Sequence, residues 1–340
     1  MVSPNESSRE RQKRLCSMFL DHWVEHQSTA VKSVLVIGAG LRDIATHIKE
    51  SNVDMCWWSW LPEPDHLHVP FPPETTFDSV IIRMPPEKER LKLCLEVAAS
   101  RMKPQAQLWL FGSNDEGVKS TPSLGKPFFH KGVTVATRRH ARIVVFERAD
   151  AGTPRHLLTE YRGSTKIETN GYAYDWAHFP GTFAKGKLDA GSQLLVEALS
   201  PSNTPRSILD YGCGTGVLLG FTRLGDLREV HALDRDYLAL EATKHNLPNA
   251  VLHWCDHLSF DSKAFDLIVS NPPIHDGKVE NHGIVENLVR QARTHLAKHG
   301  ELWMVVQHRV PVERMLKAHF HQYQIVKQNG VFKVWQAFRD

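Results

Sequence analysis

The sequence has few cysteines and no long apolar run, and each of these absences excludes a class of protein. Its 340 residues include only five cysteines, an odd number with no Cys-x-x-Cys pair. Neither a disulfide framework nor a zinc site is therefore predicted. No apolar run approaches the roughly 18 residues of a transmembrane helix, and residues 1–9 lack the apolar core of a signal peptide. We expect a cytoplasmic protein with no membrane association and no metal.

The sequence also lacks a strong excess of charge of one sign. It has 41 Lys and Arg residues against 38 Asp and Glu residues, for a net charge of +3. This balance permits RNA binding without predicting it, because nucleic-acid-binding proteins are usually more strongly basic. Basic clusters at residues 9–14, 138–142 and 185–187 point more directly to RNA. An ordinary solvated surface explains each cluster about equally well.

The strongest positive signal lies in residues 207–216, where an apolar strand runs directly into a turn. The turn carries three alternating glycines, Gly212, Gly214 and Gly216. Glycine allows a positive φ and lets a ligand approach where a Cβ would block it. A helix predicted at residues 217–221 would direct its N-terminal amides at that ligand. The pattern indicates a nucleotide-like cofactor, with an ordinary tight turn as the alternative.

Two further segments follow at suitable distances. The apolar run 229–233 ends in Asp234, about 20 residues beyond the turn, where a carboxylate can accept hydrogen bonds from a ribose diol. A predicted buried strand at 265–270 leads into Asn271-Pro272-Pro273. The Asn oxygen and the following Pro carbonyl can each accept one N–H of a planar amine, and the prolines stiffen the loop. These residues predict an N-methyltransferase that works by positioning and electrostatics. A plain strand-to-loop exit is the alternative for Asn-Pro-Pro.

A fourth segment narrows the family. Residues 179–195, together with 271–277, closely resemble the bacterial ribosomal RNA guanine-N2 methyltransferases of the small subunit, the RsmC family. The sister enzymes of the large subunit are near neighbours. The resemblance is strong from about Phe179 to the C-terminus and weaker before it. It implies S-adenosylmethionine as cofactor and the N2 amine of a specific guanosine in 16S ribosomal RNA as target. It also implies a two-domain chain with a degenerate first half. We expect a monomer that acts on ribosomal RNA, free or within an assembled or assembling small subunit.

The resemblance also assigns the site residues. The cofactor loop is matched by Asp210, Gly212, Gly214 and Gly216, the ribose ligand by Asp234 and the adenine position by Asp256. The segment that closes over the methionine end is matched by Phe183, Gly191, Ser192 and Gln193, and the catalytic loop by Asn271, Pro272 and Pro273. Many relatives have an aromatic residue after the prolines, which can stack on a flipped base. Ile274 stands there in this chain, so another ring such as Phe183 would have to take that role.

The N-terminal half reads as a degenerate copy of the C-terminal half. Residues 34–40 repeat the strand and glycine turn without the third glycine, and residues 77–86 echo 265–273 with Met84 in place of the catalytic Asn. Residues 107–112 and 142–147 echo 301–306 and 332–337. We therefore predict an α/β fold of two tandem Rossmann-like (class I methyltransferase) doubly wound sheets, the N-terminal one degenerate. Residues 1–150 would form that domain, for RNA placement or as a scaffold, and residues 155–340 the catalytic domain.

Two alternatives stay open at this point. Asn-Pro-Pro also serves enzymes that methylate other planar nitrogens: guanine N2 in large-subunit ribosomal RNA, adenine N6 or a protein glutamine amide. Only residues 179–195 and the duplication favour guanine in the small subunit. A non-catalytic RNA-binding assembly factor is an alternative of another class. The intact Asp210, Asp234 and Asn271 argue against it, because a chain freed from catalysis should lose them.

Overall fold

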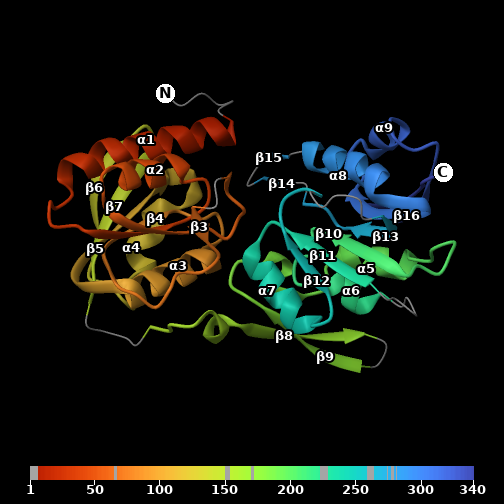
Figure 1. Ribbon diagram of the computed structural model, residues 1–340, viewed down its shortest axis with the longest axis horizontal. Helices are drawn as coiled ribbons and strands as arrows, with labels where there is room; N and C mark the ends of the chain where they lie inside the picture. The colour runs from red at the N-terminus through yellow and green to blue at the C-terminus, as the bar shows by residue number, and fades with distance from the viewer. Residues whose placement is uncertain are drawn as a thin grey trace. The chain divides into compact units, whose positions relative to one another are not determined.

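The computed structural model of the protein describes residues 7–64, 67–149, 154–169, 172–222, 229–258, 264–273, 275–276, 279–280 and 282–340. Ile274, whose role in base stacking the sequence left open, lies outside the described residues. The chain divides into two compact units, Met1–Tyr161 and Arg162–Asp340 (Figure 1). Each unit contains one seven-stranded sheet with helices on both faces. The predicted fold class, two tandem class I methyltransferase folds, is confirmed.

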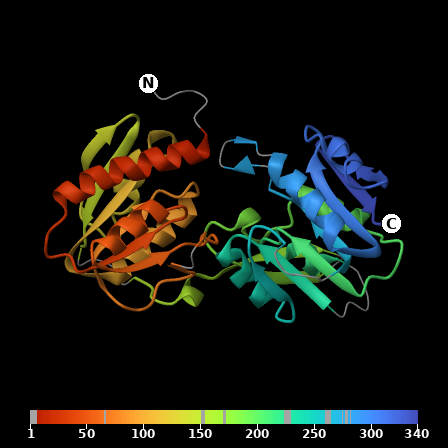
Figure 2. The ribbon, with the colours of Figure 1, turned by 45° about the horizontal axis from the view of Figure 1, so that its top comes forward.

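The first unit is built on a mixed sheet with the strand order β3-β2-β1-β4-β5-β7-β6. Its strands are β1 Ser33–Ile37, β2 Asp54–Trp58, β3 His68–Val69, β4 Phe77–Arg83, β5 Met102–Ser113, β6 Val133–Arg138 and β7 Ala141–Glu147. Its helices are α1 Ser8–His26, α2 Arg42–Glu50, α3 Lys88–Arg101 and the short α4 Thr121–Leu124. Figures 1 and 2 show α1 and α2 on one face of this sheet, and one apolar cluster joins Phe19 of α1, Ile44 of α2 and Val36 of β1.

The last residues of the first unit are fastened to α3. Arg155 forms an ion pair of 2.8 Å with Glu96 and lies with its guanidinium 4.2 Å from the centre of the Tyr161 ring. The Tyr161 hydroxyl in turn donates to the Arg155 carbonyl at 2.9 Å. The boundary between the units therefore falls after Tyr161, whereas the sequence predicted the second domain to begin at residue 155.

The second unit repeats the architecture with the strand order β12-β11-β10-β13-β16-β18-β17. Its sheet strands are β10 Ser207–Tyr211, β11 Glu229–Asp234, β12 Val251–Trp254, β13 Phe265–Ser270, β16 Leu296–Gln307, β17 Gln322–Gln328 and β18 Phe332–Phe338. Its helices are α5 Ala190–Ala198, α6 Val217–Phe221, α7 Tyr237–Asn246, α8 His282–His295 and α9 Val312–Lys317. The short strands β14 His275–Asp276 and β15 Val279–Glu280 pair with each other.

Alternation along the central strand of the second unit separates two apolar clusters. Leu209 and Tyr211 of β10 pack with residues of α8 and α9, and Ile208 packs with residues of α5, α6 and α7. Successive side chains of a strand point to opposite faces of the sheet. Asp210 is therefore directed to the same face as Ile208, toward the α5, α6 and α7 side. A carboxylate in this buried position is the first sign of a functional site.

A β-hairpin at the start of the second unit supports the glycine turn. It is formed by β8 Gly163–Thr169 and β9 Tyr172–His178. The Trp176 indole donates to the Thr215 carbonyl at 3.0 Å, and the Asn246 side-chain amide donates to the carbonyls of Ala177 and Thr215 at 3.0 and 2.9 Å. The hairpin and α7 are thus both hydrogen-bonded to the turn, which makes the turn a rigid part of the unit.

The two sheets have the same strand order, which agrees with the predicted duplication, but their register corrects one residue match. Val34 of β1 pairs with Ser79 of β4, and Ile208 of β10 pairs with Leu267 of β13. Counting four residues on from Ser79 and from Leu267 places Arg83, rather than Met84, at the position of Asn271. The prediction that Met84 replaces the catalytic Asn is therefore wrong. Matching the two Pro-Pro pairs shifted the comparison by one residue, whereas strand pairing sets the true register.

No helix within the described residues is both long and apolar enough to cross a membrane. The five cysteines are all free thiols, with Cys16, Cys94 and Cys213 buried.

Candidate active site

The glycine turn of the second unit has the open backbone that the sequence predicts. Gly212, Gly214 and Gly216 have φ values of 76°, 56° and 80°, a left-handed region that side chains other than glycine adopt with strain. The amides of Gly212 and Cys213 donate to the Leu233 carbonyl at 2.8 and 2.9 Å, which fixes the turn against β11. A Cβ built on Gly214 would meet no heavy atom within 4 Å. The space over Gly214 is therefore open to a ligand.

Asp234 lies at the end of β11, beside this turn. Its Oδ2 accepts from the Gly214 amide at 2.8 Å and its Oδ1 accepts from the Asp236 amide at 2.8 Å. Each carboxylate oxygen can accept a further hydrogen bond, which suits a diol. Desolvation by burial is the main cause that raises the pKa of Asp234 from 3.8 to about 6. The side chain is thus a well-oriented acceptor whose charge is sensitive to pH near neutrality.

Asp210 is a buried acid that the described protein leaves unsatisfied. Its exposed fraction is 0%, and neither carboxylate oxygen has a hydrogen-bond partner within the described residues. Burial, and then the charge of Asp234, raise the pKa of Asp210 well above its usual value. Buried polar groups are normally hydrogen-bonded, so one without a partner calls for an explanation. A bound group that donates hydrogen bonds or carries positive charge would supply it.

Asn271 is held at the carboxyl end of β13, next to β10. The Ser270 hydroxyl donates to the Tyr211 carbonyl at 2.7 Å and joins the ends of these two strands. The Asn271 amide nitrogen donates to both oxygens of Asp189, each at 3.2 Å, and to the Ser192 hydroxyl oxygen at 3.0 Å. No hydrogen bond to its Oδ1 is formed within the described residues. The side chain therefore presents an acceptor oxygen at the edge of the sheet where such folds bind ligands.

The other predicted site residues differ in how closely they join this group. Gly191 and Ser192 lie against Asn271, since a Cβ on Gly191 would stand 3.5 Å from its amide nitrogen. Gln193 is exposed and donates to Glu197 at 3.0 Å, so its side chain is directed along α5. Pro272 is buried, and Pro273 is exposed with its Cδ 3.7 Å from a Cβ built on Gly212.

Phe183 and Asp256 are both exposed. Phe183 is 69% exposed at the start of a turn in which Ala184 and Lys185 have φ values of 53° and 50°. Its ring is thus accessible for stacking, as the sequence analysis expects of a substitute for Ile274. The Asp256 carboxylate contacts His257, and its carbonyl accepts from the Tyr211 hydroxyl at 3.0 Å. The Tyr211 contact ties the loop after β12 to β10.

Sequence reasoning missed Asp189, Trp176 and Asn246. Asp189 is the N-cap of α5 and the main partner of Asn271, and its signal is an Asp directly before Ala-Gly-Ser at the start of a helix. Trp176 and Asn246 support the glycine turn from outside, and no local pattern distinguishes them from ordinary packing residues. Within the described residues no group of three or more His, Cys, Asp and Glu side chains could hold a metal ion.

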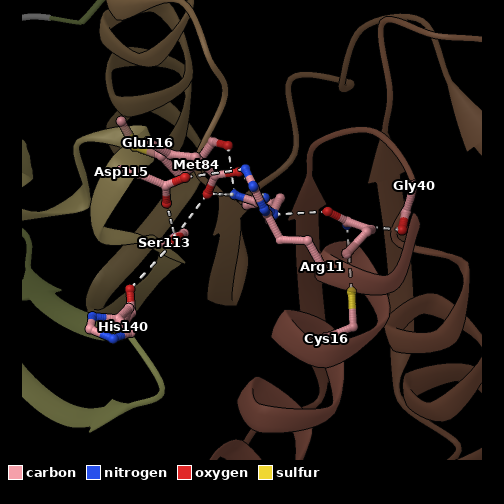
Figure 3. A network of polar contacts seen from close by, with 10 residues as sticks. Arg11, Cys16, Gly40, Met84, Ser113, Asp115, Glu116 and His140 are labelled. Atoms are coloured by element: carbon pink, nitrogen blue, oxygen red, sulfur yellow. Dashed lines mark hydrogen bonds and ion pairs between the residues drawn. The ribbon is translucent and has the colours of Figure 1, made fainter. Parts of the chain in front are cut away.

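At the equivalent position in the first unit, side chains of the protein form a network of polar contacts (Figure 3). Arg83 donates from Nε to Gln12 at 3.0 Å and forms an ion pair of 2.6 Å with Glu116. Gln12 also donates to the Gly40 carbonyl at 3.1 Å, and the Gly40 amide donates to Glu63 at 2.6 Å. Glu63 thus accepts from Gly40 as Asp234 does from Gly214. A guanidinium has no acceptor, so Arg83 cannot present an acceptor atom as Asn271 does.

The residues of the second unit fit the cofactor that the sequence predicts. S-adenosylmethionine carries a ribose diol, an ammonium group and a sulfonium. Asp234 offers the acceptors for a diol, and the unsatisfied Asp210 offers negative charge in a buried position. The space over Gly214 admits a close approach of the ligand to the backbone. In the first unit Glu63 still accepts from the Gly40 amide, but Arg83 and Gln12 lie over Gly38 and Gly40. Val36 stands there at the register position of Asp210, so the buried acid is missing.

Comparison with known proteins agrees with this geometry. The family model described as Methyltransferase small domain N-terminal matches residues 25–156, and the model described as Methyltransferase small domain matches residues 174–336. Together with the two sheets and the glycine turn, these matches define the class: methyltransferases with tandem class I folds. Ribosomal RNA small subunit methyltransferase C of Alteromonas mediterranea is 30% identical over 284 residues, which cover 80% of this chain and 76% of the relative. The chain belongs to the ribosomal RNA small subunit methyltransferase C family.

Other relatives extend the similarity along the chain. The Acinetobacter baumannii (strain AYE) protein of the same name is 28% identical over 307 residues, covering 84% of this chain and 89% of the relative. Among solved structures, the T. thermophilus 16S rRNA N2 G1207 methyltransferase (RsmC), in complex with AdoMet and guanosine, has a TM-score of 0.81 at 20% identity. That similarity covers 99% of this chain and 93% of the other, and at this identity it establishes the fold.

Proposed function

We propose that this protein methylates the N2 amine of a specific guanosine in 16S ribosomal RNA, with S-adenosylmethionine as cofactor. The observation that carries the proposal is the orientation of the Asn271 side chain at the carboxyl end of β13. Its amide nitrogen donates to Asp189, and its oxygen is left to accept a hydrogen bond. A planar exocyclic amine is a poor nucleophile that requires positioning. The family to which the chain belongs supports the choice of ribosomal RNA.

The cofactor-binding roles follow from the second unit. Asp234 accepts hydrogen bonds from the hydroxyls of a ribose. The turn at Gly212, Gly214 and Gly216 lets the ligand lie close to the backbone. Asp210, on the strand that leads into the turn, carries negative charge when a positively charged group is bound beside its unpartnered oxygens. Asp256 and Phe183 are assigned to the adenine and to the closing segment on family resemblance alone.

The catalytic roles belong to the Asn-Pro-Pro loop. S-adenosylmethionine, when bound, supplies an electrophilic methyl group. The Asn271 oxygen and the Pro272 carbonyl each accept one N–H of the guanine amine, and Pro273 stiffens the loop around them. The two acceptors orient the nitrogen lone pair and stabilise the positive charge that develops on the nitrogen. The amine proton is lost after transfer, so the loop needs no strong base.

For the first unit we propose a role in placing the RNA. Its two basic clusters, far apart in the sequence, meet in the fold: Arg14 of α1 donates to the Arg139 carbonyl at 3.2 Å. Lys13, Arg139 and His140 are exposed around this contact. Such a surface contacts phosphates and gives binding that weakens with salt. Replacement of Lys13 and Arg139 by Ala is expected to raise KM for RNA and reduce its salt dependence, with kcat unchanged.

We further propose that the protein is a cytoplasmic monomer that acts on RNA within an assembled or assembling small subunit. The five free thiols fit a reducing compartment such as the cytoplasm, where ribosomal RNA is found. Comparison of naked 16S ribosomal RNA with isolated small subunits as methyl acceptors tests the choice of substrate. Equal transfer to both would contradict a requirement for the subunit.

The central experiment is transfer of a labelled methyl group to ribosomal RNA, free and within isolated subunits, from cells that lack the gene. The modified RNA is digested to nucleosides, which are identified by mass. The proposal predicts label in N2-methylguanosine from the small-subunit RNA alone. Label in N6-methyladenosine, or in the large-subunit RNA, would overturn the substrate assignment. Absence of transfer to either RNA, both free and within isolated subunits, would favour a non-catalytic assembly role.

A further inference from the structure

We infer that Asp189 is a positioning residue, which fixes the amide of Asn271 in the one orientation that presents its oxygen to the substrate amine. The inference rests on the proposed function, because it explains how Asn271 can act as an acceptor. The contacts that carry it are the 3.2 Å hydrogen bonds from the Asn271 amide nitrogen to both Asp189 oxygens, and the 3.0 Å bond to Ser192.

The orientation of the amide follows from the chemistry of its neighbours. An ionised Asp189 has only acceptor atoms. The Ser192 hydroxyl donates its single proton to Asp189 Oδ2 at 2.6 Å, so toward Asn271 it too can only accept. All three oxygens around the amide are therefore acceptors, and only the NH2 group can face them. The rotated amide would bring Asn271 Oδ1 against three oxygens, which removes the usual ambiguity in the orientation of an Asn side chain.

Asp189 is itself held by the start of α5. As N-cap, its Oδ1 accepts from the Gly191 amide at 2.9 Å and from the Ser192 amide at 3.4 Å. A Cβ on Gly191 would stand 3.2 Å from Asp189 Oδ1, so glycine lets the helix end approach the carboxylate closely. The helix backbone thus restrains Asp189, which in turn restrains Asn271. The site is organised before the substrate arrives, which is the arrangement that lowers a reaction barrier.

The first unit also has a contact between the helix before its first strand and the end of a central strand, but this contact leaves no acceptor atom for a substrate. There Gln12 of α1, the helix that precedes the first strand, accepts from Arg83 Nε at 3.0 Å. The donor is a guanidinium, which has no acceptor atom left to offer a substrate. In the second unit the donor is an amide, and its donation to an anion increases the negative partial charge on its own oxygen. That oxygen is the better acceptor as positive charge develops on the substrate nitrogen.

The variant Asp189→Asn separates positioning from helix capping. Asn caps helices about as well as Asp, so α5 is retained. Its NH2 group, however, can donate to the oxygen of Asn271 and favour the rotated amide. We expect kcat to fall by roughly 10–100-fold, the effect of misplacing one preorganised polar group. KM for RNA and the Kd for the cofactor should stay within about threefold of wild type.

An exchange of the two side chains provides a sharper test. Asn271→Asp alone places two carboxylates together and should lower kcat. The double variant with Asp189→Asn and Asn271→Asp restores one donor and one acceptor and leaves a carboxylate oxygen for the substrate. Its kcat relative to wild type should exceed the product of the relative kcat values of the two single variants by at least about tenfold, the coupling expected of directly interacting groups. A merely structural role for Asp189 gives additive losses, and additivity would overturn the inference.

Asp266→Asn is the matched control. Asp266 lies on β13 at the end opposite to Asn271, and it likewise accepts two backbone amides, Arg206 at 2.8 Å and Ser207 at 3.0 Å. The same chemical change there should alter stability without altering kcat. Equal losses of kcat in Asp189→Asn and Asp266→Asn would count against positioning by Asp189.

A readout independent of turnover is the side-chain NH2 signal of Asn271 in the NMR spectrum of the cofactor-free protein, assigned by its loss in Asn271→Ala. In wild type the two protons should exchange slowly with water and be shifted by the carboxylate. In Asp189→Asn they should move toward free-amide values. An unchanged signal, or wild-type kcat, rejects the inference and leaves the proposed function intact. Failure of the wild-type protein to form N2-methylguanosine would instead reject the proposed function.

Discussion

Arg83 occupies in the first sheet the register position that Asn271 occupies in the second. Ser79 and Leu267 pair with equivalent residues of their central strands, and each lies four residues before the position in question. In one unit this position bears a guanidinium bound to Glu116, and in the other an amide bound to Asp189. One substitution at a strand end thus separates a side chain that offers an acceptor from one that cannot.

Asn271→Ala is expected to abolish most transfer to guanine N2. The change removes the acceptor that we propose to hold the amine and to stabilise its developing charge, so kcat should fall by roughly 10²–10³-fold. Cofactor affinity should remain close to wild type, because Asn271 is assigned to the substrate amine. Single-turnover assays on ribosomal RNA, with the product identified by mass, measure this. Full turnover by the variant would contradict the mechanism.

Arg83→Ala is expected to lower stability and leave turnover unchanged. Arg83 is 8% exposed, and removal of its side chain leaves Glu116 without its ion-pair partner. The loss of one partner of a largely buried pair should cost about 3 kcal/mol. Denaturant unfolding of the variant measures this loss. Met84→Ala, at the adjacent buried position, is the control: it should cost about 2–5 kcal/mol through lost packing alone, and it too should leave kcat unchanged. A loss of kcat in Arg83→Ala under folding conditions would contradict the assignment of the first unit as non-catalytic.

The glycine turn, Asp234 and Asn271 could be predicted from the sequence because each is part of a local pattern. A strand followed by Gly-x-Gly-x-Gly leaves few conformations for the turn, and an acid at the end of the next parallel strand must lie beside it. Arg83 could not be predicted, because its match to Asn271 depends on strand pairing and the Pro-Pro pair misleads. The sequence also does not show which residues of one segment reach the site. Ser192 contacts Asn271, whereas the side chain of Gln193, the next residue in the helix, is directed to Glu197.

The role of Asp189 was beyond sequence reasoning for a different reason. Asp189 and Asn271 are 82 residues apart, and they meet only because the start of α5 reaches the carboxyl end of β13. A helix cap gives a local signal, but the second use of the same carboxylate has none. The degenerate site of the first unit is similar, since Gln12 reaches Arg83 across 71 residues. Contacts between residues so far apart in the sequence have no local signal, and only the folded structure shows them.

Asp234→Ala is expected to weaken cofactor binding, with one site per chain in the wild-type protein. Loss of the ribose acceptors should cost about 1–3 kcal/mol, the range for hydrogen bonds to a charged group. Because the pKa of Asp234 is raised to about 6, wild-type affinity should fall as pH decreases through that value and the carboxylate takes up a proton. Titration calorimetry between pH 5 and pH 8 measures both effects. Two equivalent sites, or an affinity independent of pH, would contradict the assignment.

Asp210→Asn is expected to make the cofactor-free protein relatively more stable at high pH while weakening cofactor binding. Burial raises the folded-state pKa of Asp210 well above that of the unfolded chain. The folded state therefore binds more protons than the unfolded state once pH exceeds the unfolded value, and stability falls as pH rises through the interval between the two pKa values. Asn does not titrate, so the difference in free energy of unfolding should shift in favour of the variant from pH 4 to pH 8. Urea unfolding at several pH values measures that difference. Comparison of the slopes of unfolding free energy against pH for the wild type and the variant cancels the constant effect of burying an amide.

Saturating S-adenosylmethionine should stabilise the wild type more than the variant, because the buried charge then has a partner. A difference that stays constant with pH would show that the buried carboxylate is already satisfied, and Asp210 would then have no part in holding the cofactor.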